Sequence, residues 1–337
     1  MNILVTGGTG YIGSHTCVEL IESGHSVVIV DNLYNSSIDV LEKIEKITGV
    51  KPKFYQIDLL DKNNLEEVFK ENKFDACIHF AGYKAVGESV QIPLTYYKNN
   101  ISGSINLYEL LRKYNVDNLV FSSSATVYGD GFKVPFKEEY GLGKTTNPYG
   151  SSKMMNEMIL NDLGKADTKM STVLLRYFNP IGAHESGLIG EIPNGTPNNL
   201  VPYIAQVACG QREYLRVWGN DYDTVDGTGV RDYIHVVDLA KAHVLAIEYA
   251  SKHTSTQTIN VGTGKGYSVL EVLHAYEKAC GHEIAYRIMD RRPGDIAVCY
   301  ADTSKAKELL GFEAKYDIDK MCEDSFKFTS SLSTLSK

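Results

Sequence analysis

Near its amino terminus the chain reads Asn2-Ile3-Leu4-Val5-Thr6-Gly7-Gly8-Thr9-Gly10-Tyr11-Ile12-Gly13. The apolar run over residues 3–6 is typical of a buried strand, and the apolar spacing over residues 13–23 is typical of a helix. Glycines between such elements allow a tight turn, close approach to a pyrophosphate and close packing of the helix on the strand. The helix start adds free amide groups and a positive dipole end. The segment therefore predicts a dinucleotide site.

The next strand-like run supports that prediction and selects the cofactor. Residues 26–30 are rich in β-branched side chains, and Asp31 ends them, 18 residues after Gly13. A carboxylate at this place accepts hydrogen bonds from a ribose 2′-OH and repels a 2′-phosphate, which favours NAD over NADP. The alternative is an ordinary turn followed by a solvent-exposed aspartate. That alternative would not explain why a strand, the glycines, a helix, a second strand and an acid occur in this order.

The same alternation continues along the chain and predicts the fold class. Strand-like runs recur at residues 53–56, 76–80, 119–122 and 172–175, with helical stretches between them. Strands alternating with helices form βαβ units, so we expect an α/β fold with a Rossmann-type doubly wound parallel sheet. After about residue 179 the texture changes, because residues 180–200 are rich in Gly, Pro and Asn and lack a clear period.

This change of texture suggests a division of the chain. We expect an NAD-binding Rossmann domain over residues 1–178, to which a segment at about 230–245 returns. A smaller C-terminal α/β lobe, mainly residues 179–328, is expected to bind the substrate. Residues 329–337 are mostly Ser and Thr, which makes them a candidate for a disordered tail.

Composition excludes several classes of protein. A formal net charge of -8 argues against a general nucleic-acid binder. The six cysteines form no Cys-x-x-Cys pair, so neither a zinc site nor a disulfide framework is expected, and we predict no metal. The start of the chain lacks the pattern of a signal peptide, and no apolar run reaches the ~20 residues of a membrane span. We therefore expect a reduced, cytoplasmic protein with no membrane or nucleic-acid partner.

Two further segments suggest a catalytic set. Three serines, residues 122–124, end a predicted strand, and Tyr149 and Lys153 lie four residues apart after Asn147-Pro148, which suits a helix start. A tyrosine of ordinary pKa ~10 needs roughly 4 kcal/mol of stabilisation of its phenolate to act as a base near pH 7. A nearby ammonium and an oxidised nicotinamide ring can supply it, and Ser124 can hydrogen-bond the same substrate oxygen.

Alone, this Tyr-x-x-x-Lys spacing is common and usually marks an exposed helix turn. Together with the glycine motif, it resembles the extended branch of the short-chain dehydrogenase/reductase superfamily. Longer stretches at residues 1–31, 79–89, 175–183 and 229–240 are similar to the family of UDP-sugar 4-epimerases, and the likeness extends to about residue 315. The resemblance implies an isomerase that interconverts UDP-glucose and UDP-galactose through a 4-keto sugar. NAD would be tightly bound and regenerated in each turnover.

The resemblance also implies roles for individual residues. Tyr149, as phenolate, would take the proton of the sugar 4-OH, Ser124 would contact the 4-oxygen, and Lys153 would hold the nicotinamide ribose and lower the pKa of Tyr149. The expected cofactor-binding residues are Gly7, Gly10, Tyr11, Ile12, Gly13, Asp31, Asn32, Asn35, Ser36, Asp58, Leu59, Phe80, Ala81, Gly82, Lys84, Asn99, Ser124, Tyr149, Lys153, Tyr177 and Phe178. The expected UDP-sugar contacts are Ser124, Tyr149, Asn179, Asn199, Leu200, Arg216, Trp218, Arg231, Tyr233, Arg292, Asp295 and Cys299. Members of the family are usually homodimers that pack through two helices per subunit, and the resemblance implies that these would be roughly residues 93–114 and 149–163 here.

The chemistry of the nucleotide diphosphate indicates which residues of the second half of the chain could bind the substrate. A sugar that must rotate needs its diphosphate held firmly, and guanidinium groups such as those of Arg231 and Arg292 do this best. Surface salt bridging is the alternative role for this pair. Cys299 stands where some members of the family carry a tyrosine, and the smaller side chain leaves room for an N-acetyl group. We therefore expect UDP-GlcNAc and UDP-GalNAc as further substrates, unless Cys299 is only a packing residue.

Two other functions remain as alternatives. Nucleotide-sugar 4,6-dehydratases share the fold and the Tyr/Lys pair, but they carry an acid and a base directly after the catalytic serine or threonine. Ala125 and Thr126 hold those positions here and cannot transfer that proton. A non-catalytic NAD-sensing Rossmann protein would be expected to lack Tyr149 or Lys153, and both are present.

Overall fold

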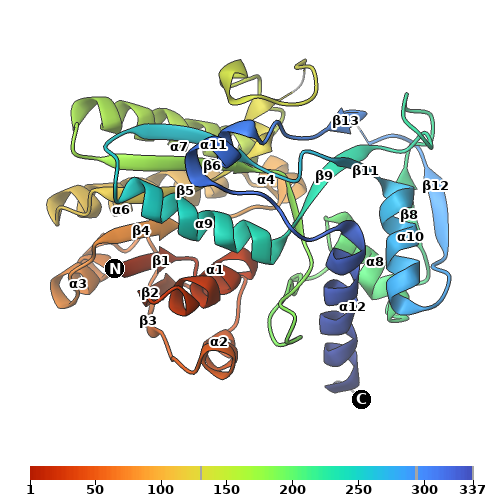
Figure 1. Cartoon of the computed structure of the whole chain (residues 1–337), viewed down its shortest axis with the longest axis horizontal. Helices are drawn as coiled ribbons and strands as arrows, with labels where there is room; N and C mark the ends of the chain where they lie inside the picture. Colours follow the sequence, from red (N-terminus) through yellow and green to blue (C-terminus); the bar gives the residue numbers. More distant parts are fainter. Residues whose placement is uncertain (130, 293–294, 336–337) are drawn as a thin grey trace.

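Seven parallel strands form the main sheet of the computed structural model, which describes residues 1–129, 131–292 and 295–335. The strands are β1 (Asn2–Thr6), β2 (Ser26–Asp31), β3 (Lys53–Gln56), β4 (Ala76–His79), β5 (Asn118–Ser124), β6 (Ser171–Tyr177) and β10 (Thr256–Val261). Their order across the sheet is β10-β6-β5-β4-β1-β2-β3 (Figure 1). The predicted Rossmann-type α/β fold is confirmed, and strand order reverses at β1, where such sheets bind ligands.

Helices cover both faces of this sheet. One face carries α1 (Tyr11–Glu22), α2 (Val40–Thr48), α9 (Val236–Ala250) and α11 (Ser304–Leu310). The other carries α3 (Lys62–Glu71), α6 (Gly103–Lys113) and α7 (Pro148–Ala166). A hydrophobic core lies between the sheet and the helices on each face. Successive side chains of β1 point to opposite faces, so Ile3 and Val5 pack on the α1 side and Leu4 packs on the α3 side. Each of these side chains stabilises the fold by about 1.5–3 kcal/mol.

The helix expected over residues 93–114 is interrupted. It consists of α5 (Pro93–Tyr97), a π-helical turn at Lys98–Ser102, and α6, and a short helix α4 (Val86–Gln91) precedes it. Buried Asn100 sits in the π turn, where its side chain accepts from the Tyr83 backbone amide and donates to the Tyr83 carbonyl and to Ser152. Burial of this amide requires those partners, and the extra residue in the turn directs it to them.

A smaller lobe follows the sixth strand. One sheet pairs β9 (Val230–His235) with β7 (Asn179–Ile181), β11 (Gly266–Ser268) and β13 (Val298–Cys299), and a second pairs β8 (Leu215–Trp218) with β12 (Tyr286–Met289). Helices α8 (Leu200–Ala208), α10 (Val269–Cys280) and α12 (Ile318–Leu335) complete it. Figure 1 shows these elements to the right of the main sheet, with β9 leading back to α9, which packs beside α1.

Two segments differ from the sequence-based expectation. Besides α9, which returns to the main sheet near the expected residues 230–245, β10 and α11 also join that part of the fold. Moreover, α12 continues to Leu335, through most of the Ser/Thr-rich stretch 329–337, while residues 336–337 lie outside the described ones. Buried Phe328 packs against Gly190, so tertiary packing holds the helix where composition alone suggested disorder. No helix of the described residues is long and apolar enough to cross a membrane.

Candidate active site

The glycine turn is built so that only glycine fits at its two tightest points. Gly7 has φ +72°, and a β-carbon there would lie 2.7 Å from the Ala81 backbone nitrogen. A β-carbon on Gly13 would lie 2.2 Å from the Gly7 carbonyl oxygen. Gly10 is the N-cap of α1, so the free amides of the first helical turn follow directly. The turn thus leaves space for a pyrophosphate against the backbone.

Asp31 stands beside this turn at the end of β2. Its carboxylate accepts hydrogen bonds from the Thr9 and Leu33 backbone amides at 3.2 and 2.9 Å and from the Ser36 hydroxyl at 3.3 Å. A carboxylate offers about four lone-pair sites, so capacity remains for a ribose hydroxyl. A cradle that a β-carbon would fill, with helix amides on one side and an acid on the other, fits a dinucleotide.

The predicted cofactor residues all follow the carboxyl ends of strands in the main sheet or lie close to them. Asn32 donates from its amide to Asp58 at 2.9 Å, which joins the ends of β2 and β3. The backbone amides of Phe80 and Ala81 both donate to the Thr6 carbonyl, at 3.0 and 3.1 Å. Asn35, Leu59, Gly82, Tyr177 and Phe178 occupy the loops and strand ends around them, and Asn99 lies in the π-helical turn before α6.

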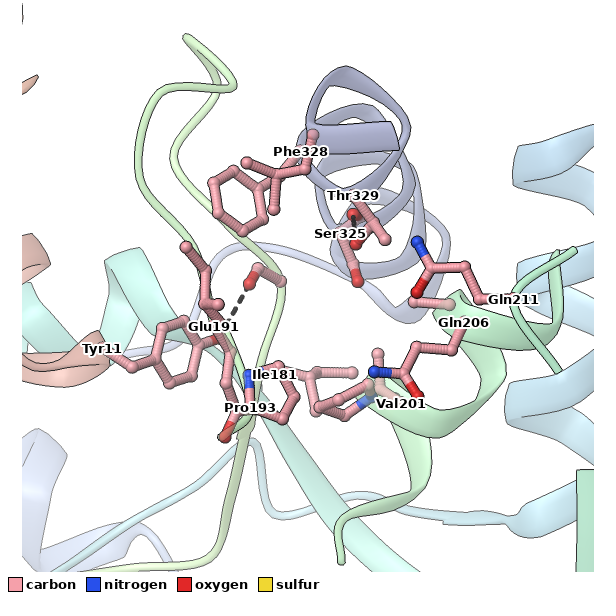
Figure 2. Close-up of a pocket in the computed structure, with 15 residues that line it drawn as sticks. Tyr11, Ile181, Glu191, Pro193, Val201, Gln206, Gln211, Ser325, Phe328 and Thr329 are labelled. Carbon is pink, nitrogen blue, oxygen red and sulfur yellow. Dashed lines mark hydrogen bonds between the residues drawn. The ribbon is translucent and has the colours of Figure 1, made fainter. Parts of the chain in front are cut away.

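The segment after β7 crosses the start of α1. Glu191 accepts from Lys84 at 2.8 Å, and the Tyr11 hydroxyl donates to the Gly182 carbonyl at 2.7 Å. Figure 2 shows Tyr11 and Glu191 on one side of a cavity whose other walls come from α8 and α12, including Phe328. Among the residues predicted to bind ligands only Tyr11 lines this cavity, so it lies beside the predicted site.

The three predicted catalytic residues meet at the end of β5. Ser124 is the last residue of that strand, and Asn147 caps α7 by accepting from the Gly150 amide at 2.9 Å, so Tyr149 lies in the first helical turn. The Ser124 hydroxyl and the Lys84 ammonium both lower the pKa of Tyr149, but burial raises it more, and the pKa lies above its ordinary value. A phenolate near neutral pH therefore needs further positive charge.

Lys153 is held by the strand rather than by Tyr149. Its Nζ donates to the Ser122 carbonyl at 2.5 Å and lies 4.9 Å from the centre of the Phe121 ring. Burial lowers the pKa of Lys153 to about 8, although the Glu157 carboxylate opposes this shift. The Lys84 ammonium thus lowers the pKa of Tyr149 from another loop, and the action of Lys153 on Tyr149 stays a prediction.

The two arginines expected to hold the diphosphate share one acidic partner. Arg231 approaches Asp295 at 3.6 Å and Arg292 donates to it at 3.0 Å. The Arg292 guanidinium also lies 5.8 Å from the centre of the Trp218 ring. Arg216, in contrast, has an exposed side chain in register with Arg287 of β12. Pro293 and Gly294, in the same sequence motif as Arg292, lie outside the described residues.

The remaining predicted substrate residues belong to strands of the small lobe or to the start of α8. Asn179 pairs in register with Tyr233, while Asn199 is exposed at the N-cap of α8, before Leu200. Cys299 pairs in register with Arg231 and packs against a cluster that contains Phe178 and Tyr128. Burial raises the pKa of the Cys299 thiol to about 11, so this side chain is uncharged. The cluster joins the expected cofactor side to the expected substrate side.

Three charged residues at this site were missed from the sequence. Arg176 is buried in β6 and pairs with buried Glu157 of α7, and Glu191 pairs with Lys84. An arginine directly after the apolar run at residues 173–175 was the available signal, because such a residue is rarely buried without a partner. The loop that carries Glu191 offered no comparable pattern.

Comparisons with known proteins agree with this geometry. The NAD dependent epimerase/dehydratase family matches residues 3–262. UDP-glucose 4-epimerase of Bacillus subtilis is 59% identical, covering 98% of this chain and 97% of that protein, and the Mus musculus enzyme of the same name is 53% identical, covering 97% and 96%. A Stenotrophomonas maltophila UDP-glucose-4-epimerase structure with bound NAD and formylated UDP-arabinopyranose has a TM-score of 0.97 at 50% identity and 99% coverage of both chains. The Bifidobacterium longum enzyme, solved with NAD+ and UDP, has a TM-score of 0.95 at 54% identity, covering 98% of each chain.

The close approach at Gly13 makes a prediction about cofactor binding. Gly13→Ala places a methyl group against the Gly7 carbonyl, so the turn must shift, at a cost of about 1–3 kcal/mol. We expect the purified variant to have lost most of its NAD, measured by absorbance of the supernatant after acid precipitation, and to melt at a lower temperature. Gly87→Ala is the control, because a β-carbon there meets no atom within 4 Å. Full NAD content in Gly13→Ala would contradict the assignment of this turn.

Proposed function

The chain belongs to the NAD-dependent epimerase/dehydratase family, and from that membership we propose that it interconverts UDP-glucose and UDP-galactose as a 4-epimerase. The observation that carries the proposal is the meeting of Ser124 and Tyr149 at the end of β5, on the sheet edge that bears the glycine turn. High identity to relatives of that activity over nearly the full length supports the same reaction.

The chain's residues supply proton transfer and orientation. NAD, held by the glycine turn and Asp31, would supply a hydride acceptor and donor for the sugar and a positive charge. Tyr149 takes the proton of the sugar 4-OH as a phenolate and returns it after the 4-keto sugar has turned. Ser124 hydrogen-bonds the same oxygen, and the Lys84 ammonium stabilises the phenolate. Lys153 holds the cofactor ribose from its anchored place on the Ser122 carbonyl.

In this proposal the diphosphate of the substrate is bound apart from the reacting sugar. We assign the diphosphate to Arg231 and Arg292, which both reach Asp295 and are therefore close to each other. Guanidinium groups bind phosphate oxygens in pairs, which fixes the diphosphate while the hexose stays free to rotate. Asn179, Asn199, Leu200, Trp218 and Tyr233 are assigned to the same substrate.

This arrangement disfavours the alternative reactions. A 4,6-dehydratase needs an acid and a base after Ser124, but Ala125 has no proton to transfer and the Thr126 hydroxyl donates to Ser124 itself at 3.0 Å. A non-catalytic NAD sensor would not need Tyr149 and Ser124 in contact. Because epimerisation causes no net oxidation of the sugar, the glycine turn and Asp31 would keep the same NAD bound over each turnover.

We also propose a division of labour and a location for the chain. Residues 1–178, with the returning segment near 230–245, would bind the cofactor, and residues 179–328 would mainly bind the UDP-sugar. Cys17, Cys77 and Cys322 keep buried free thiols, which suits the reducing cytoplasm. Fractionation of the producing cells tests this location.

An exposed apolar surface supports a homodimer. Large apolar side chains gather on α4, α5 and α7, with Leu94 81%, Val90 61% and Met158 51% exposed. These helices pack against one another, so their exposed side chains belong to one region of the surface. Two copies that meet through this region would remove its apolar side chains from water.

Replacement of the tyrosine tests the reaction. Tyr149→Phe removes the hydroxyl that carries the proton but keeps the ring that packs beside Ser124. We expect the variant to retain NAD and to lose more than 1000-fold in kcat with UDP-glucose in a coupled assay without added NAD, because one essential proton transfer is absent. Epimerase activity close to that of the parent would refute the proposal.

The side chain at position 299 tests substrate range. We expect the parent chain to epimerise UDP-GlcNAc and UDP-GalNAc, and Cys299→Tyr to lower kcat/KM for these two by at least about tenfold (~1.4 kcal/mol) while activity on UDP-glucose persists. Cys299→Ala is the matched control, since it keeps the volume free. A parent enzyme that fails on UDP-GalNAc would show that Cys299 only packs.

A charge in the apolar surface tests the homodimer. Leu94→Lys should convert the dimer to monomer in sedimentation velocity at micromolar concentration, because a lysine cannot be buried there unpaired. Val225→Lys is the control, since Val225 is 80% exposed but lies in the loop before β9. A parent chain that sediments as a monomer would rule out this interface.

A further inference from the structure

A buried ion pair lies about one helical turn beyond Lys153 on α7. Glu157 and Arg176 have side chains only 1% and 3% exposed. Arg176 donates from Nη2 to Glu157 Oε2 at 2.6 Å and from Nε to Oε1 at 2.9 Å, and the Ser123 hydroxyl donates to Oε1 as well. Arg176 therefore binds the Glu157 carboxylate in a bidentate manner, and the carboxylate has Ser123 as a third donor. This is the geometry of a strong charge-assisted hydrogen bond.

The pair joins the segments that carry the catalytic residues. Glu157 is four residues after Lys153 on α7, and Ser123 directly precedes Ser124 in β5. Arg176 pairs in register with Ser123 and is followed by Tyr177, whose hydroxyl contacts that of Ser122. These contacts fix the middle of α7, one turn after Lys153, relative to the ends of the neighbouring strands β5 and β6.

Arg176 extends the contact to the loop after β5. Its guanidinium lies 4.6 Å from the centre of the Tyr128 ring, and Nη1 donates to the Gly141 carbonyl at 3.2 Å. Tyr128 in turn donates to buried Asn260 at the end of β10.

We propose that the Glu157–Arg176 pair is a positioning device for the catalytic residues, which sets the place of Ser124 and Lys153 relative to Tyr149. This inference rests on the proposed function. Neither residue of the pair is assigned to touch the substrate or the cofactor. A purely structural pair would support only the stability of the fold.

The charge of Glu157 also reaches Lys153. Burial lowers the pKa of Lys153 to about 8, and the carboxylate opposes this shift. The other groups that face Lys153 are the Ser122 carbonyl, the Phe121 ring and buried His79, which is neutral because burial lowers its pKa to about 3. Those that face Tyr149 are Ser124, Lys84 and Tyr177.

Removal of the Glu157 carboxylate lowers the pKa of Lys153. Lys153 then loses its proton at a lower pH, so the fraction of molecules that carry the ammonium at pH 8 falls. The alkaline limb of the kcat profile should then move to lower pH by about one unit, since one pH unit corresponds to a tenfold change in protonation. KM for UDP-glucose should stay within twofold, because the diphosphate is held in the other lobe.

Three variants of the full chain separate positioning from stability. Glu157→Gln keeps the shape of the side chain but leaves the Arg176 charge buried and unpaired, so we expect this variant to melt at a lower temperature as well. Glu157→Gln with Arg176→Met removes both charges and should recover most of the melting temperature. Asp162→Asn is the control, since this carboxylate lies on the exposed side of α7.

We expect the double variant to retain its NAD and its thermal stability while kcat stays at least tenfold low and the alkaline limb stays shifted. A second readout needs no turnover: the phenolate absorbance near 295 nm, taken as each variant minus its Tyr149→Phe counterpart, should titrate at higher pH than in the parent. A double variant with parental kcat, pH profile and phenolate titration would overturn the inference. Failure of the proposed function would instead appear as activity in Tyr149→Phe alone.

Discussion

The active site depends on the parallel arrangement of the strands, because the carboxyl ends of parallel strands all lie along one edge of the sheet. Gly7 after β1, Asp31 in β2, Ala81 after β4, Ser124 in β5 and Tyr177 in β6 reach the same place for this reason alone. The close approach of Gly13 to the Gly7 carbonyl then fixes α1 against β1. A single geometric rule therefore brings residues that are more than one hundred positions apart into one site.

Local patterns explain what could be predicted. The apolar runs of β1 to β6, the glycine turn and the Asn147-Pro148 helix start are each readable within a dozen residues, and all lie in the structure where the sequence placed them. The missed features depend on distant partners. The π turn around Asn100 exists because Tyr83 and Ser152 satisfy a buried amide, and α12 extends past residue 329 because Phe328 packs on Gly190. No short window of sequence contains both members of such a pair.

The same distinction holds within the site. Tyr149 and Lys153 were found from their spacing, yet their surroundings were not, since Lys84 acts on Tyr149 from another loop and Lys153 is anchored to the Ser122 carbonyl. The buried partners Glu157 and Arg176 come from different elements and are visible only once helix and strand are packed. Residue type can thus be inferred from sequence, whereas the charges that tune each residue are a property of the packing.

The carboxylate of Asp295 gives the diphosphate assignment a consequence for selectivity. It lies against Arg231 and Arg292, so the two guanidinium groups already share an anion that belongs to the chain. A ligand that takes the proposed place must displace this internal competitor. A small anion with one charged group replaces the contact of Asp295 by another of similar strength, so its binding gains little free energy. A group with two linked phosphates can engage both guanidinium groups at once, so we expect the proposed site to discriminate against common inorganic anions without any steric barrier to them.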